Sequence, residues 1–330
     1  MRYIALVAVP AVLTAAFLYT ASDSRQTVSA QDFINLQQGS SVQQGFRRAH
    51  AKGFCVYGRF EASGELAAYS RASLFQAGSY PFIGRFSVAG SNPTAPDLKA
   101  PVRSLALTIL PNTAEQWRTA MNTPPVLAVG TPEKFYQQLA ALQNNSIGEF
   151  FAANPETAAF RQWRASYQPT QSYATEQYHS IHAFYLVDSQ GQQQAARWAI
   201  VPKAVAGNTT LDDSADNALE QEFLSRLKQA PVEFDLVFTL ATEKDNPQDP
   251  TVLWPETNPQ IQAGIIQITL ASKQENGLCN AINFDPLVLP DGLLPSADPI
   301  LRARAAAYAE SHRRRAREVL METVVGDKHE

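Results

Sequence analysis

Short apolar or alternating runs between residues 53 and 110 are typical of β-strands. They are GFCVYGRFEA, YPFIGRFSVAG and VRSLALTIL, and glycine, proline, asparagine and aspartate separate them. The pattern returns in VEFDLVFTLAT and AGIIQITLAS, and IHAFYLVDSQGQQQAARWAIVPKA predicts a hairpin that turns around residues 189–192. Because regular helices do not alternate with these runs, the pattern favours an antiparallel sheet or closed barrel over a doubly wound fold.

Helix signals are inserted between the strands and gather near the C-terminus. TAEQWRTAM predicts a helix that starts near Ala114, and TPEKFYQQLAALQ predicts one capped by Thr131. ALEQEFLSRLKQ is amphipathic. In SADPILRARAAAYAESHRRRAREVL, Asp298 followed by Pro299 is a strong helix start. The predicted fold class is therefore α+β, a β-rich body with inserted and C-terminal helices.

The first residues have the order of an export signal. In MRYIALVAVPAVLTAAFLYTAS, Arg2 precedes an apolar run that small and polar residues follow. The run is short for a membrane span of about 20 apolar residues, so a cleaved signal and an N-terminal anchor both stay open. We expect an exported protein that is periplasmic, or anchored in the membrane facing the periplasm. The expected division is a signal or anchor over residues 1–30, a Gln- and Ser-rich linker over 31–46, a folded body over 47–320 and a tail over 321–330.

Composition and motifs exclude several classes of protein. The 330 residues are 45% hydrophobic, which suffices for a large core, and the net charge of −4 argues against a general nucleic-acid partner. The chain has no CxxC, HExxH, GxGxxG or GxxxxGK[ST] motif, so the usual zinc, iron–sulfur and nucleotide sites are not expected. Cys55 and Cys279 could form a disulfide, but the place of Cys55 inside a strand pattern favours packing in the core.

One face of the predicted C-terminal helix carries a succession of polar groups. Arg304 and Tyr308 are four residues apart, and Ser311, His312 and Arg315 continue the same stripe. The simplest interpretation is an exposed polar face. The alternative is contact with a buried anionic ligand or cofactor, because a positive charge beside a tyrosine favours the phenolate form that can bind haem iron.

The remaining segments resemble a known family in their order along the chain. RRAHAKGFCVYGRF, IGRFSVAG, MNTPPV, DPTVLWP, INFDPLVLPDGLLPSAD and RARAAAYAESHRRR are similar to segments of the catalase superfamily, in particular its small branch of catalase-related haem peroxidases. The resemblance extends from about residue 47 to residue 317. It implies a catalase-type antiparallel β-barrel that binds haem b. It also implies a chain without the C-terminal helical and flavodoxin-like domains of large catalases.

The resemblance also implies roles for individual residues. On the distal side it makes His50 the acid and base, Asn122 its polar partner and Ser87 the residue behind the histidine. On the proximal side it makes Tyr308 the iron ligand, held as phenolate by Arg304. It places three arginines near the haem propionates, namely Arg47, Arg85 and Arg315. It places the aromatic ring of Phe135 on the distal face of the haem. Ala49 departs from the valine of the large members, so we expect a wider approach to the iron.

The implied activity is reduction of hydrogen peroxide or an organic hydroperoxide with a small organic reductant, with weak catalase activity. The alternatives are a true catalase and a hydroperoxide isomerase or allene oxide synthase. A non-enzymatic exported barrel that binds lipid or haem is a third. His179 and His182 are expected to have core or surface roles. We expect a monomer or small homo-oligomer, and the reductant stays unidentified.

Overall fold

The computed structural model describes residues 27–207, 210–275 and 277–326. Most of the predicted export signal therefore lies outside the described residues. Among the described helices, none is both long and apolar enough to cross a membrane.

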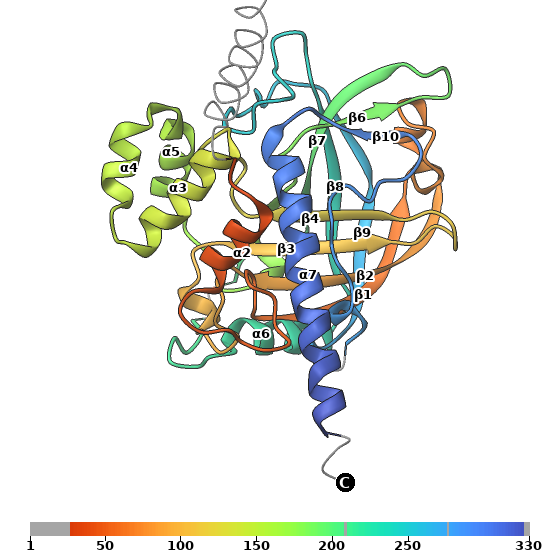
Figure 1. Cartoon of the computed structure of the whole chain (residues 1–330). Helices are drawn as coiled ribbons and strands as arrows, with labels where there is room; N and C mark the ends of the chain where they lie inside the picture. The colour runs from red at the N-terminus through yellow and green to blue at the C-terminus, as the bar shows by residue number, and fades with distance from the viewer. Residues whose placement is uncertain (1–26, 208–209, 276, 327–330) are drawn as a thin grey trace, which may run out of the picture.

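An antiparallel β-barrel forms the body of the molecule (Figure 1). Within the described residues, eight strands close the ring in the order β1-β2-β3-β4-β5-β7-β8-β9, and β9 pairs back onto β1. Their bounds are β1 Gly53–Ala62, β2 Gly78–Val88, β3 Arg103–Ile109, β4 Trp117–Asn122, β5 Tyr178–His179, β7 Gln193–Pro202, β8 Val232–Leu240 and β9 Gln260–Lys273. Two further strands extend the sheet beside β7, namely β6 Phe184–Val187 and β10 Leu293–Pro295. The predicted antiparallel barrel and the β6–β7 hairpin are confirmed.

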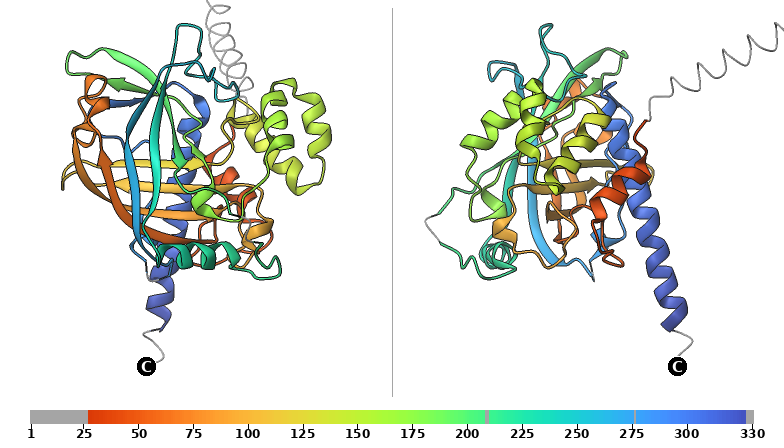
Figure 2. Two further views of the ribbon diagram at one scale, coloured as in Figure 1. Left: turned by 180° about the vertical axis from the view of Figure 1, so that it is seen from behind. Right: turned by 60° about the vertical axis from the view of Figure 1, so that its left-hand side comes forward.

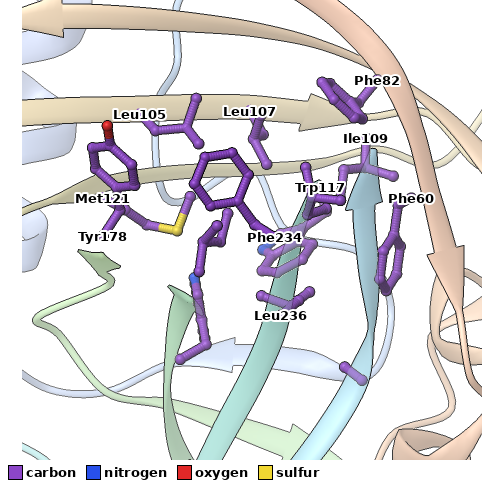
Figure 3. Close-up of a cluster of buried hydrophobic side chains, with 14 of the residues drawn as sticks. Phe60, Phe82, Leu105, Leu107, Ile109, Trp117, Met121, Tyr178, Phe234 and Leu236 are labelled. Carbon is purple, nitrogen blue, oxygen red and sulfur yellow. The ribbon is translucent and has the colours of Figure 1, made fainter. Parts of the chain in front are cut away.

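Alternation along the strands fills the barrel with apolar side chains. In β2, Phe82 and Phe86 are buried among the residues of the main core, whereas Arg85 and Ser87 lie on the opposite face. Figure 3 shows the interior cluster, which includes Phe60, Leu105, Leu107, Ile109, Trp117, Met121 and Phe234. Since this interior is packed with side chains, the outer face of the strands is where a ligand can bind.

Helices lie around the barrel (Figure 1). They are α2 Ala30–Gln38, α3 Pro132–Gln143, α4 Ile147–Ala153, α5 Ala158–Ser166, α6 Ala218–Leu227 and α7 Pro299–Gly326. Short 3-10 helices occur at Glu65–Ala68, Ser73–Phe75, Asp97–Lys99, Pro155–Thr157, Tyr173–Thr175 and Leu278–Asn280. The long helix α7 runs across β1–β4 with α2 at its side, while α3–α5 form a separate group (Figures 1 and 2).

Helix caps agree with the sequence signals at two starts. The Thr131 side chain accepts a hydrogen bond from the Lys134 amide at the start of α3. At the start of α7, the Asp298 carboxylate accepts one from the Ile300 amide at 2.9 Å. The helices predicted from TPEKFYQQLAALQ, ALEQEFLSRLKQ and the segment after Asp298 are confirmed as α3, α6 and α7.

The helix expected near Ala114 is wrong, because the segment forms strand β4. The Asn112 side chain accepts hydrogen bonds from the Ala114 and Glu115 amides, so the polar residues make a turn instead of a helix cap. After the turn, Trp117 and Met121 point into the core with the two-residue period of a strand. Burial of these side chains outweighs the local helix signal.

The linker expected over residues 31–46 begins as a helix. Ser29 and Asp32 form a capping box at the start of α2, and Phe33 and Ile34 are buried. The polar residues that follow Leu36 gave no sign that Phe33 and Ile34 are buried. At the other end, α7 continues to residue 326, into the expected tail.

Cys55 and Cys279 form a disulfide, which corrects the expectation that Cys55 only packs in the core. Cys55 lies on the outer face of β1, and Cys279 lies in the turn Leu278–Asn280. Both side chains are fully buried. The bond therefore attaches the segment before α7 to the barrel wall.

Candidate haem-type active site

A pocket lies between the outer face of β2–β4 and helix α7. About 1290 Å³ of it is not filled by protein atoms, counting the part open to solvent. All nine residues that the sequence assigned to a site line it: Arg47, His50, Arg85, Ser87, Asn122, Phe135, Arg304, Tyr308 and Arg315. The structure thus brings together residues up to 268 positions apart in the chain.

His50 stands on one wall with an unusual backbone conformation. Its φ of +56° lies in the left-handed region, which a residue with a side chain occupies only when its surroundings hold it there. The Arg85 guanidinium donates to the carbonyls of His50 at 2.9 Å and Ala51 at 3.1 Å, and the Ala51 amide donates to the Gly90 carbonyl. These bonds fix the ring of His50 toward the pocket.

Gly53 makes room for this support. A Cβ at this position would lie 2.1 Å from the Phe86 carbonyl and 2.8 Å from the Arg85 guanidinium. A side chain here would push the guanidinium away from the backbone of His50. Gly53 therefore leaves the space that the Arg85 guanidinium needs to bind the backbone of His50.

The imidazole of His50 is kept neutral. Burial lowers its pKa from 6.5 to about 4, and the positive charges of Arg85, Arg304 and Arg47 act in the same direction. A neutral imidazole carries one ring N–H and one lone pair. His50 is therefore able to accept a proton at neutral pH.

Two serine hydroxyls from neighbouring strands lie near Nδ1 of His50. Ser87 Oγ on β2 lies 3.5 Å from it, and Ser104 Oγ on β3 lies 3.3 Å from it. Ser104 also donates to Asn122 Oδ1 on β4 at 2.5 Å. Ser87 thus lies beside His50, and Ser104 is an additional neighbour of both His50 and Asn122.

Helix α7 supplies the opposite wall. Arg304 Nη2 lies 3.4 Å from Tyr308 Oη and 3.3 Å from the Ala120 carbonyl of β4. At the start of the helix, Asp298 contacts His182 Nδ1 at 2.5 Å, and both side chains are almost fully buried. His182 is a core residue, as expected, and this pair anchors the helix that carries the tyrosine.

Four arginines border the pocket, and no aspartate or glutamate is among its described lining residues. Burial and the neighbouring Arg315 lower the pKa of Arg85 to about 9, and burial with Arg85 and Arg315 lowers the pKa of Arg47. Uncompensated positive charge in a buried site is unfavourable unless an anion joins it. A ligand with two carboxylates suits this set.

Backbone carbonyls before α7 hold two of these arginines. Arg47 Nη2 donates to the carbonyls of Cys279 and Ile282, each at 3.0 Å. Arg315 Nη1 donates to the backbone carbonyl of Asn280 and to its side-chain oxygen, the latter at 2.9 Å. His312 Nε2 lies 3.1 Å from the Ala281 carbonyl. The disulfide at Cys279 therefore stabilises the segment that orients the cations.

An aromatic group closes the side of the pocket near α2. Phe135 and Phe33 line it, with ring centroids 6.1 Å apart, and Phe33 meets Tyr136 edge to face at 5.6 Å. Such flat apolar surface suits a large planar ligand. The sequence identified Phe135 through the family resemblance, whereas Phe33 lay in the expected linker.

Other lining residues escaped the sequence-based predictions. Ser104 lies near the start of β3, and the register that pairs it with Asn122 was its one available signal. Ile181 lines the pocket with a φ of +65°, which is a strained conformation for a β-branched residue. No local pattern marks that strain.

The family model for catalase matches residues 30–324 of this chain. The chain belongs to the catalase family. A catalase-related peroxidase of Synechococcus elongatus is 36% identical over 325 residues, which cover 94% of each chain. A second catalase-related peroxidase, from Mycolicibacterium paratuberculosis, is 28% identical and covers 82% of this chain and 89% of its own. The expected membership in the small branch of the catalase superfamily is confirmed.

Solved structures agree at the level of the fold. A bacterial catalase superposes with a TM-score of 0.73 at 19% identity, covering 86% of this chain and 60% of its own. Catalase A of Saccharomyces cerevisiae gives 0.72 at 19% identity, with 86% and 63% covered. The chain spans about 60% of the length of these catalases. Haem binding follows from the family, and the pocket's flat aromatic wall, its four arginines and its tyrosine fit such a group.

Proposed function

We propose that this protein is a haem-dependent peroxidase that reduces hydrogen peroxide or an organic hydroperoxide with a small organic electron donor. The observation that carries the proposal is one pocket with a neutral histidine and an asparagine on one wall and an arginine–tyrosine pair on the other. Relatives that match nearly their whole length to this chain are named catalase-related peroxidases. We expect dismutation of peroxide to be the weaker activity.

Haem b is the proposed cofactor. Tyr308 would hold the iron, and Arg47, Arg85 and Arg315 would meet the propionates. Covalent attachment through thioethers needs free cysteines, and both cysteines of the chain are joined in the disulfide. When bound, the haem supplies an iron centre that accepts the oxidising equivalents of the peroxide and passes them to the donor.

The residues of the chain supply proton transfer and orientation. His50 accepts the proton from one oxygen of the peroxide at its free ring nitrogen and returns it to the other oxygen. Asn122 donates a hydrogen bond that orients the peroxide and stabilises charge as the O–O bond breaks. Two electrons from the donor and two protons convert hydrogen peroxide to two waters. An organic hydroperoxide leaves as an alcohol and one water.

We also propose that the protein is exported. The apolar N-terminal run has the composition of a signal or anchor, and disulfides such as Cys55–Cys279 persist mainly in oxidising compartments. Cell fractionation and N-terminal sequencing of the native protein test this. Recovery in the cytosol with free thiols would contradict it.

The visible spectrum of the purified protein tests the cofactor, and two assays test the reaction. We expect a haem Soret band that Tyr308→Phe shifts or abolishes and that the matched control Tyr185→Phe, on strand β6, leaves unchanged. We expect peroxide-dependent oxidation of a phenolic dye to exceed oxygen release. Vigorous oxygen release with negligible dye oxidation would mean a true catalase, and rearrangement of fatty-acid hydroperoxides without a donor would mean an isomerase. A purified protein without haem and without peroxide turnover would refute the proposal.

A further inference from the structure

We infer that Ser104 is a positioning residue that sets both the ring tautomer of His50 and the amide orientation of Asn122. The inference rests on the proposed function for its kinetic consequence. Its structural part does not, because it follows from hydrogen bonds within the chain. Ser104 is not the serine that the family resemblance placed behind the histidine, which is Ser87.

The first step concerns the single hydroxyl proton of Ser104. A serine hydroxyl has one donor proton and two acceptor lone pairs. Its Oγ lies 2.5 Å from Asn122 Oδ1, an atom that can only accept, so the proton of Ser104 points to Asn122. The remaining lone pairs of Ser104 are then available to another donor.

The second step concerns the ring of His50. Nδ1 lies 3.3 Å from Ser104 Oγ, whose proton is already used. The contact is therefore a hydrogen bond only if Nδ1 carries the ring proton. Ser87 Oγ at 3.5 Å can share the same proton. In a neutral imidazole this leaves Nε2 with the lone pair, so the nitrogen on the far side of the ring is the base.

The third step concerns the amide of Asn122. Because its oxygen accepts from Ser104, its NH₂ group is the part left to donate toward the pocket. A rotated amide would present oxygen to the peroxide and would reverse the bond, with its NH₂ donating to Ser104 Oγ. The Ser104 hydroxyl thus leaves a proton acceptor on His50, which general base catalysis requires. It also leaves a hydrogen-bond donor on Asn122, which stabilisation of developing charge requires.

The register of the barrel explains why Ser104 can do this. Ser104 pairs directly with Ser87 on β2 and with Asn122 on β4, so all three side chains share one row on the outer face. Ser104 stands in the middle of the row and is 7% exposed.

The test compares kinetics and ring tautomer in matched variants. Ser104→Thr and Ser104→Val differ by a hydroxyl against a methyl group of the same size, and Ser104→Ala removes the group. Thr108→Val is the control, because it removes a hydroxyl from the same face of the same strand outside the pocket. Loss of two ordinary hydrogen bonds predicts a fall in kcat/KM for peroxide of roughly five- to thirtyfold in the Val and Ala variants. We expect kcat/KM of Ser104→Thr to stay within about threefold of the wild-type value. We expect kcat/KM of Thr108→Val to equal the wild-type value.

A second readout does not depend on turnover. In NMR spectra of the full chain with labelled histidine, His50 is identified by the signals that His50→Gln removes. We expect the Nδ1–H tautomer in wild type and Ser104→Thr, and a mixture of tautomers in Ser104→Val. In a double-mutant cycle, we also expect the kinetic effect of Ser104→Ala to shrink when Asn122→Ala is already present.

The outcomes separate the two proposals. If wild type lacks haem or peroxidase activity, the proposed function fails. The NMR measurement of the His50 tautomer still tests the role of Ser104 in that case. An unchanged tautomer in Ser104→Val, or equal kcat/KM in the Thr and Val variants of an active enzyme, would overturn the inference. Strictly additive effects of Ser104→Ala and Asn122→Ala would overturn the link to Asn122. The Thr and Val pair keeps the test valid if the Ala variant does not fold.

Discussion

The depressed pKa of His50 predicts activity that persists into acid. If the neutral imidazole is the base, kcat/KM for peroxide follows its titration in the free enzyme. With a pKa of about 4, roughly 90% of the molecules hold neutral His50 at pH 5, against about 3% for an unperturbed histidine. Burial is the largest cause of the shift, and a bound macrocycle increases burial, so we expect the plateau to extend at least to pH 5.

The same shift predicts a loss of stability in acid. The unfolded chain binds a proton near pH 6.5, whereas folded His50 binds one near pH 4. The stabilising contribution is therefore complete above pH 6.5 and is lost as the pH falls from 6.5 to 4. The full shift predicts a loss of about 2 kcal/mol between pH 7.5 and pH 5. Because one edge of the ring faces the pocket and its water, we expect about 1 to 2 kcal/mol.

Urea denaturation at pH 7.5 and pH 5 measures this loss, with His50→Gln as the matched variant. Burial also lowers the pKa of His179 and of His182 to about 4, so part of the pH dependence remains in the variant. The difference between wild type and His50→Gln isolates the share of His50. A kcat/KM profile that falls about thirtyfold between pH 7.5 and pH 5 would refute the reasoning, because it would show a histidine with an ordinary pKa.

Three further predictions test other parts of the site. The disulfide closes a loop with a sequence separation of 224. Replacing both Cys55 and Cys279 with alanine should lower the free energy of unfolding by about 3 to 5 kcal/mol in urea titrations, and a loss below about 1 kcal/mol would contradict this. Arg47→Gln should weaken haem binding about tenfold in titrations at low salt, whereas the exposed control Arg59→Gln should not change it. Phe33→Ala should cost about 3 kcal/mol of stability and raise turnover of bulky donors relative to small ones, and equal turnover of both would show that Phe33 does not restrict entry.

The barrel could be predicted from the sequence because its strands alternate so regularly. In β2, Phe82 and Phe86 face the core while Arg85 and Ser87 face the pocket, and this two-residue period is visible in YPFIGRFSV. The cap at Asp298 likewise marks the start of α7. Both signals are local, and local signals survive in a single sequence.

The features that were missed depend on contacts between distant segments. Trp117 belongs to a strand because the barrel interior accepts its ring, although TAEQW begins with helix-forming residues. Cys55 meets Cys279 only after the strands are paired. Ser104 acquires its importance from the register that sets it between Ser87 and Asn122. Spacing along the chain contains none of this information.

The places where the chain departs from local preference are concentrated around one pocket. His50 and Ile181 hold left-handed backbone conformations there, and four arginines approach one another without a lining carboxylate. Each departure lowers the stability of the chain without its ligand, and such costs persist at functional sites. A dianionic planar ligand would relieve the largest of them by neutralising the arginines. We therefore expect haem to raise the free energy of unfolding in proportion to the logarithm of its concentration above the dissociation constant. That gain should be smaller in Arg47→Gln than in wild type. An equal gain in both would show that the arginine cluster serves the fold and not the ligand.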